Sequence, residues 1–218
     1  MSEVQQSHSS KKPVNPSQVR SVDVAVVGGG IAGKACALGL AQLGLTAAEI
    51  APDLASPAPA PQGNQWGQRI YAFSPSTQEL LAHLQIWDAL DHSRIQVVRD
   101  MRIYGDRGER NDQLHLSAFE AGTSQLAWIG ESNLIEHTLD QASRFQNKLE
   151  RINDAVEKIE VNTQGSTLHL KNGEPLHAQL VVAADGANSP IRSAIGITAS
   201  EESYSQTAVV ANWICTYP

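Results

Sequence analysis

Three glycines near the start of the chain have the spacing that a nucleotide-binding turn requires. The sequence Gly28-Gly29-Gly30-Ile31-Ala32-Gly33 follows an apolar run and precedes a helix-like segment. In such a turn Gly28 permits the tight bend, Gly30 leaves room for a pyrophosphate, and Gly33 lets the helix pack closely on the strand. The helix N-terminus then offers free N–H groups to the phosphates. The pattern predicts dinucleotide binding; a glycine-rich turn without ligand and a methyltransferase-type loop are the alternatives.

An acidic residue about 20 positions further along should complete such a site by binding the ribose hydroxyls. Glu49 and Asp53 both fall in this window, and both share side-chain parity with Ala51. Pro52 disfavours a strand that continues past Ala51, so neither acid has the position expected of a ribose ligand. Lys34, just inside the helix, is expected to face solvent.

Asp185 and Gly186 form a second candidate site, because they end the apolar run from Leu180 to Ala184. Ligands of open α/β sheets bind at the carboxyl ends of buried strands. An Asp-Gly turn in which Asp185 caps its own backbone would explain the same residues without a ligand. The histidines have no metal-ligand spacing, so no metal site is predicted.

These candidates need a sheet and helices to position them. Apolar runs predict strands at 22–27, 45–51, 69–73, 126–130 and 180–184. Helical patterns and start signals predict helices at 31–43, 75–84 and 133–142. Alternating apolar and polar residues predict hairpins at 97–104 with 113–119 and at 155–161 with 166–170. Together they indicate an α/β core with an inserted antiparallel sheet.

The composition is that of a globular protein and excludes some classes of partner. The chain has 218 residues, 41% of them hydrophobic, and a net charge of −7, which disfavours nucleic acid as a partner. No apolar run reaches the ~18 residues of a transmembrane helix. Residues 1–20 are polar and predict a disordered tail rather than a signal peptide. The 2 cysteines favour a reducing, cytoplasmic setting.

Four segments along the chain suggest a family. They are GGGIAGKACALGLAQLGL, RIYAFSPSTQELLAHLQIWDAL, WIGESNLIEHTL and ADGANSPIR. In this order they resemble the flavoprotein aromatic hydroxylases of the p-hydroxybenzoate hydroxylase type, closest to the ubiquinone-biosynthesis hydroxylase branch. The resemblance spans about Val22 to Trp213. It implies a Rossmann-like FAD-binding domain with inserted antiparallel strands of a substrate domain.

The resemblance also implies roles for single residues. Gly28, Gly30 and Gly33 would hold the FAD pyrophosphate, and Arg69, otherwise an ordinary surface arginine, would reach the FAD phosphate or ribose. Glu131 would approach the adenosine. Asp185 and Gly186 would contact both FAD and NAD(P)H, with Ser189 and Arg192 completing their motif. The ribose-binding glutamate of the family falls on Ala51, which leaves Glu49, two residues earlier, as its substitute.

The chemistry that the resemblance implies is flavin-dependent hydroxylation. NAD(P)H would reduce FAD, and O2 would then supply the oxygen atom for an aromatic ring, in this branch that of a polyprenylated phenol in ubiquinone biosynthesis. The substrate would be small, aromatic and lipophilic. The protein would be cytoplasmic, with a peripheral association with a membrane or with a biosynthetic complex. No catalytic acid or base can be named from the sequence.

The implied domains are a tail at 1–20, an FAD-binding domain at 21–96 and 120–200, and a partial substrate-domain sheet at 97–119 and 201–218. The third FAD motif of the family, Gly-Asp followed by Ala-Ala-His, does not occur in the sequence. The C-terminal part of the fold is therefore expected to be missing. Two alternatives to a monooxygenase stay open: a non-catalytic nucleotide-binding remnant or complex-forming protein, and a flavin-dependent reductase.

Overall fold

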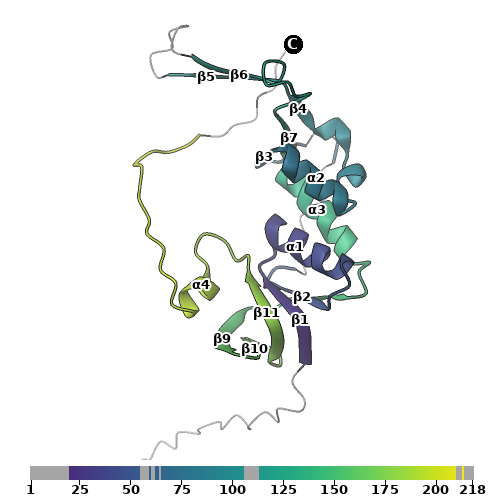
Figure 1. Ribbon diagram of the computed structural model, residues 1–218, viewed down its shortest axis with the longest axis vertical. Coiled ribbons are helices and arrows are strands. Elements are labelled where there is room, and N and C mark those ends of the chain that lie inside the picture. Colours follow the sequence, from purple (N-terminus) through teal and green to yellow (C-terminus); the bar gives the residue numbers. More distant parts are fainter. Residues whose placement is uncertain are drawn as a thin grey trace, which may run out of the picture.

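A six-stranded sheet forms the base of the computed structural model, which describes residues 20–54, 59, 62–63, 65–105, 113–209 and 213 (Figure 1). The strand order is β8-β2-β1-β11-β10-β9. The bounds are Arg20–Val27 for β1, Ala47–Ile50 for β2, Leu149–Ile152 for β8, Val156–Asn162 for β9, Gly165–Leu170 for β10 and Leu176–Ala183 for β11. The first four strands of this order are parallel, and β10 and β9 continue the sheet antiparallel. Because β1 lies between β2 and β11, the glycine turn that follows β1 has a strand end on either side.

Helices pack on this sheet and on one another. They are α1 (Ile31–Gln42), α2 (Pro75–His83), α3 (Ser132–Ser143) and the short α4 (Pro190–Ala194), with the 3-10 turns η2 (Trp87–Ala89) and η3 (His92–Arg94). One buried apolar cluster joins the strands through residues such as Ile50 and Leu176. A second joins the helices through Leu38, Ile135 and Leu139. The helical cluster fixes α1, whose N-terminus is part of the candidate site.

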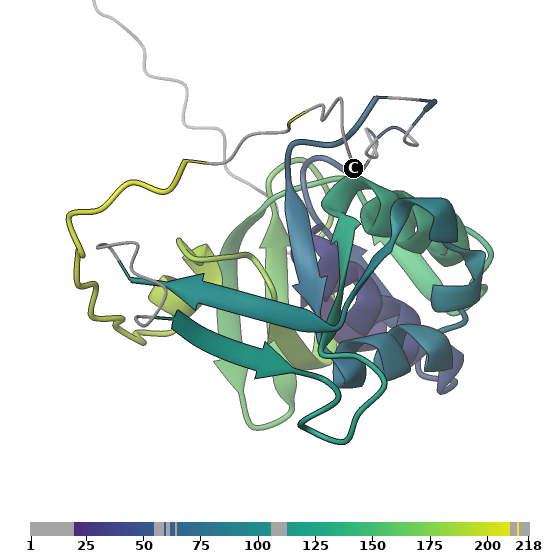
Figure 2. The same ribbon diagram turned by 90° about the horizontal axis from the view of Figure 1, so that it is seen from above.

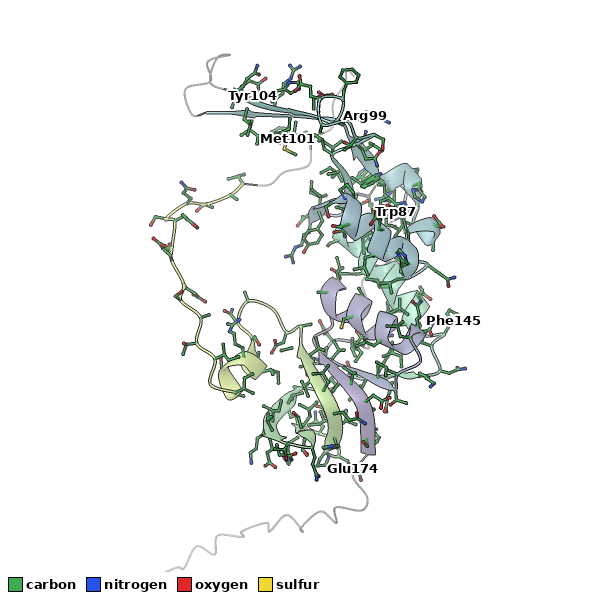
Figure 3. The ribbon with its side chains drawn as sticks, viewed as in Figure 1. Trp87, Arg99, Met101, Tyr104, Phe145 and Glu174 are labelled. Carbon is green, nitrogen blue, oxygen red and sulfur yellow. The ribbon has the colours of Figure 1, made fainter. Side chains whose placement is uncertain are left out.

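Two smaller antiparallel sheets lie beyond the helices (Figures 1 and 2). The first contains β3 (Ile70–Phe73), β7 (Ala127–Glu131) and β4 (Gln96–Val98), and the second is the hairpin of β5 (Asp100–Tyr104) and β6 (Gln113–Ser117). Met101 and Tyr104 lie on opposite faces of the hairpin (Figure 3). The face that carries Met101 is apolar and exposed, formed by Met101, Ile103, Leu114 and Leu116.

The predicted α/β core with inserted antiparallel strands is confirmed, although several bounds differ. Strand β8, with the sequence LERI, was not predicted because two adjacent charged residues interrupt the apolar run that is typical of a buried parallel strand. Strand β11 begins at Leu176 rather than at residue 180. The run 97–104 is divided between β4 and β5, which belong to different sheets.

The two ends of the chain are described only in part. Residue 20, placed in the predicted tail, begins β1, and residues 1–19 lie outside the described part. Residues 201–209, expected to belong to a partial substrate-domain sheet, form no helix or strand, and of residues 210–218 only 213 lies within the described part. None of the helices in the described part is long and apolar enough to cross a membrane.

Candidate functional site

The glycine turn is held between two strand ends. The backbone N–H of Gly28 donates to the carbonyl of Ile50 at 2.9 Å, and the N–H of Ala184 donates to the carbonyl of Val27 at 2.7 Å. Gly28 has a φ of +131°, and a Cβ there would lie 2.1 Å from the carbonyl oxygen of Ala184. A Cβ on Gly33 would lie 2.0 Å from the carbonyl oxygen of Gly28. The close approach of β1, α1 and β11 therefore requires glycine at both positions.

A cavity of about 440 Å³ opens at this turn, at the carboxyl ends of β1, β2 and β11. Gly28, Gly30, Asp185 and Gly186 all line it. Gly30 is the N-cap of α1 and has no side-chain hydrogen bond to offer, and the first turn of α1 holds no acidic residue. A Cβ on Gly30 would meet nothing within 4 Å. The uncapped N–H groups and the empty space beside them fit a phosphate group.

Asp185 caps the turn before α4 with one carboxylate oxygen and buries the other. Its Oδ2 accepts a hydrogen bond from the N–H of Ile191 at 3.0 Å, close to the start of α4. Its Oδ1 is buried and has no hydrogen-bond partner among the residues that the structure describes. Ser189 caps the same helix by accepting from the N–H of Arg192 at 3.0 Å. A buried carboxylate oxygen without a donor is costly, and a ligand hydroxyl in the cavity would satisfy it.

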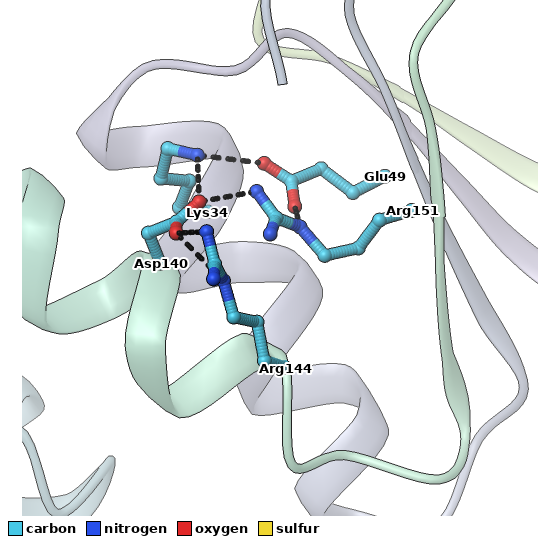
Figure 4. A network of polar contacts seen from close by, with 5 residues as sticks. All are labelled: Lys34, Glu49, Asp140, Arg144 and Arg151. Atoms are coloured by element: carbon cyan, nitrogen blue, oxygen red, sulfur yellow. Dashed lines mark hydrogen bonds and ion pairs between the residues drawn. The ribbon is translucent and has the colours of Figure 1, made fainter. Parts of the chain in front are cut away.

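Glu49 does not line this cavity, because a buried ion cluster holds its carboxylate (Figure 4). The side chains of Glu49 and Asp140 are 0% exposed. Lys34 Nζ lies 3.5 Å from Glu49 Oε1 and 3.4 Å from Asp140 Oδ1. Arg151 donates from Nε to Glu49 Oε2 at 3.1 Å and also to Asp140. The expectation that Lys34 faces solvent is wrong, since two buried carboxylates draw its ammonium inward.

The cations of the cluster outweigh the cost of burying the carboxylate of Asp140. Burial alone would raise the pKa of this group. The hydrogen bond and charge of Arg151, with the charges of Lys34 and Arg144, hold the pKa of Asp140 below its ordinary value. The cluster joins α1, β2, α3 and β8, so it fixes the helix that begins at the glycine turn.

Glu131 is also engaged within the protein. Its Oε1 accepts from Arg94 Nε at 2.7 Å, and its Oε2 accepts from Arg94 Nη2 at 3.0 Å and from the N–H of Gly67. Arg94 also donates to the carbonyls of Gly63 and Gln65 at 2.9 and 2.7 Å. Its guanidinium lies 4.2 Å from the ring centroid of Trp66. The pair of Glu131 and Arg94 thus anchors residues 63 and 65–67 to the end of β7.

Glu131→Gln is expected to lower the free energy of unfolding by about 1–3 kcal/mol, because the amide keeps only one acceptor oxygen for the N–H donors of Arg94 and Gly67 and turns its own NH2 group toward the others. Urea denaturation measures the loss, and limited proteolysis should cut earlier near residues 62–67. Glu120→Gln is the matched control, since Glu120 is exposed. Equal stability of the two variants would contradict the anchoring role.

Arg69 lies outside the cavity. Its side chain is exposed, and its guanidinium carbon lies 5.3 Å from the ring centroid of Tyr71. The structure thus brings Gly28, Gly30, Asp185 and Gly186 together, with Gly33 packed behind them. It leaves Glu49, Arg69 and Glu131 away from that cavity. Arg94, Asp140 and Arg151 were not anticipated, because their partners lie far away in the sequence and leave no local pattern.

Comparison with known proteins matches most of the chain to one family model. Residues 21–216 match the model described as FAD binding domain. The chain is 32% identical over 197 residues to the 3-demethoxyubiquinol 3-hydroxylase of Escherichia coli, covering 88% of this chain and 48% of that protein. It is 27% identical over 202 residues to a ubiquinone biosynthesis monooxygenase of Caenorhabditis elegans, covering 87% and 43%. The chain therefore spans about half the length of the curated relatives it matches.

Solved structures share the fold at lower identity. The p-nitrophenol 4-monooxygenase PnpA of Pseudomonas putida superposes with a TM-score of 0.64 at 24% identity, over 83% of this chain and 45% of that one. PqsL, a probable FAD-dependent monooxygenase of Pseudomonas aeruginosa, gives a TM-score of 0.65 at 18% identity, over 85% and 48%. At these identities the likeness concerns the fold alone.

Proposed function

Because this chain belongs to the FAD binding domain family, we propose that it binds FAD as part of a monooxygenase that hydroxylates an aromatic ring. The observation that carries the proposal is the cavity where the glycine turn, the uncapped N-terminus of α1 and Asp185 meet. Its volume of about 440 Å³ suits the adenosine and pyrophosphate half of the cofactor.

Each part of the cavity would have a separate task in binding. The backbone at Gly28 and Gly30 and the first N–H groups of α1 would hold the pyrophosphate. Asp185 Oδ1 would accept a hydrogen bond from a hydroxyl of the cofactor. When bound, the flavin would supply the redox chemistry, taking a hydride from NAD(P)H and activating O2 for transfer of one oxygen atom.

The names of the relatives support a substrate of the ubiquinone pathway, and we propose a polyprenylated phenol. The exposed apolar face of the hairpin β5–β6, formed by Met101, Ile103, Leu114 and Leu116, supports a lipophilic substrate. We assign this hairpin, within 97–119, and residues 201–218 to a substrate domain, and 21–96 and 120–200 to the FAD-binding domain. Such a substrate resides in a bilayer, so we infer a cytoplasmic protein that works at the membrane surface or in a biosynthetic complex.

The purified chain is expected to bind FAD. Titration of the protein with FAD should quench the flavin fluorescence to saturation, and denaturation should release intact FAD. A chain that leaves both the absorbance and the fluorescence of added FAD unchanged would contradict the proposal.

Turnover separates the three candidate activities. NADPH-dependent oxygen uptake with formation of a hydroxylated prenylphenol supports the monooxygenase. NADPH oxidation without hydroxylated product indicates a flavin-dependent reductase. FAD binding without NADPH oxidation indicates a nucleotide-binding protein that is not catalytic by itself.

A further inference from the structure

The end of strand β2 presents no carboxylate to the cavity. The side chain of Ala51, at this end, is a methyl group that is 4% exposed. Both oxygens of Glu49 are held by Lys34 and Arg151 within the buried ion cluster. A nucleotide bound at the glycine turn would therefore find no acid for its ribose hydroxyls at the usual place in the strand.

Asp53 brings a carboxylate to the same cavity from the turn that follows β2. It lines the cavity together with Gly29, and its Oδ1 lies 3.2 Å from the position that a Cβ on Gly29 would occupy. The side chain is exposed, and within the described part of the chain its carboxylate has no hydrogen bond or ion pair. The next residue, Leu54, is 6% exposed and packs beside Gly29, which holds the turn in place.

The other carboxylates of the cavity are less suitable. Asp154 accepts from the N–H of Ala155 at 2.8 Å and from the N–H of Asn172 at 3.0 Å, so its own turn occupies it. Asp185 follows β11, on the other side of β1 from β2. Asp53 is thus the carboxylate beside β2 with both oxygens open to a ligand.

We propose that Asp53 accepts hydrogen bonds from the ribose hydroxyls of the adenosine half of FAD, a role that rests on the proposed function. Two carboxylate oxygens can accept from two neighbouring hydroxyls, and such charge-assisted bonds are strong. The same negative charge repels a phosphate on the ribose. Asp53 therefore selects nucleotides with free ribose hydroxyls over those with a 2′-phosphate.

A comparison of two ligands on two variants tests this role with the full chain. Calorimetric titration should show that ADP binds the native protein at least tenfold more tightly than 2′,3′-dideoxy-ADP, and tenfold corresponds to about 1.4 kcal/mol. In Asp53→Asn the affinity for ADP should be at most about threefold higher than that for 2′,3′-dideoxy-ADP, because the charged acceptor is lost. The thermal midpoint of the free protein should be unchanged. Asp53→Glu keeps the carboxylate and should restore most of the ratio.

Asp88→Asn is the matched control, since Asp88 is exposed on η2 and does not line the cavity. It should keep the native ratio. Equal affinities of the native protein for ADP and dideoxy-ADP, with FAD still bound, would overturn the role of Asp53 alone. An unchanged ratio in Asp53→Asn would do the same. No binding of FAD or ADP by the native chain would overturn the proposed function as well.

Discussion

Gly28→Ala is expected to lower the free energy of unfolding by about 3 kcal/mol or more. The backbone at this position has a φ of +131°, which residues with a Cβ rarely adopt. The added methyl would also lie 2.1 Å from the carbonyl oxygen of Ala184. Since the N–H of Ala184 ties β11 to β1, relief of the clash would separate the two strands at the sheet centre. Urea denaturation followed by circular dichroism measures the loss.

Gly30→Ala is the matched control, because the same methyl is added two residues away. Gly30 has an extended backbone with a φ of −78°, and a Cβ there meets nothing within 4 Å. The variant should unfold within about 1 kcal/mol of the native protein, the usual scale of an N-cap change. Its affinity for FAD should fall at least tenfold, because the methyl enters the space beside the N–H groups of α1. Two variants of equal stability would show that the turn is not constrained as described.

Asp140→Asn is expected to destabilise the protein by about 3–5 kcal/mol, the usual cost of removing one partner from a buried ion cluster. The side chain of Asp140 is 0% exposed and forms ion pairs with Lys34, Arg144 and Arg151. When the charge of Asp140 is removed, Glu49 is the only carboxylate of the cluster left to pair with Lys34 and Arg151. Chemical denaturation at neutral pH measures the effect.

The effect of Asp140→Asn should depend on pH in a definite direction. The pKa of Asp140 is lowered in the folded protein, so this group stabilises the fold above the pKa of about 4 of an unfolded aspartate. That contribution is lost as the pH falls through the folded-state pKa. The difference between the native protein and the variant should therefore be full at pH 7 and shrink below pH 4. A difference that grows on acidification would contradict the cluster as described.

Two further variants test whether the effect belongs to the cluster. Lys34→Met removes one cation, and the double variant with Asp140→Asn should lose less stability than the sum of the single losses, because the two groups interact directly. Asp88→Asn makes the same chemical change at an exposed position and should have little effect. Strict additivity of Lys34→Met and Asp140→Asn would contradict the coupling.

Local patterns were sufficient to predict the parts of the fold that lie close together in sequence. The turn from Gly28 to Gly33 has its strand, its helix and its glycines within one short segment, so its geometry follows from the residues themselves. Asp185 could be placed at a strand end for the same reason. The start of the helix predicted at 75–84 is also set locally, since Ser74 accepts a hydrogen bond from the N–H of Thr77 at the start of α2.

The parts that could not be predicted depend on residues far apart in the sequence. Lys34 is amphipathic and looks like a surface residue until Asp140, 106 positions away, is placed beside it. Glu49 lies in the sequence window of a ribose ligand, but its carboxylate is bound by Arg151 on β8. The sequence of β8 does not have the apolar pattern of a strand, so this partner could not be predicted. The position of Asp53 depends on how the turn after β2 packs against Gly29. Spacing along the chain therefore gave a window that contains both Glu49 and Asp53, but it could not decide which of the two lines the cavity.

The strand order has a consequence for how the chain folds during synthesis. Strand β1, its glycine turn and β2 are synthesised well before β11, yet β1 pairs on its other side with β11, at residues 176–183. The bond from Ala184 that closes the turn is made by a residue synthesised more than a hundred positions later. Such nonlocal pairing slows folding, because a long loop must close before the contacts that compensate for it can form. The cavity at the glycine turn is thus complete only after β11 has been made, although the glycines that identify it are synthesised much earlier.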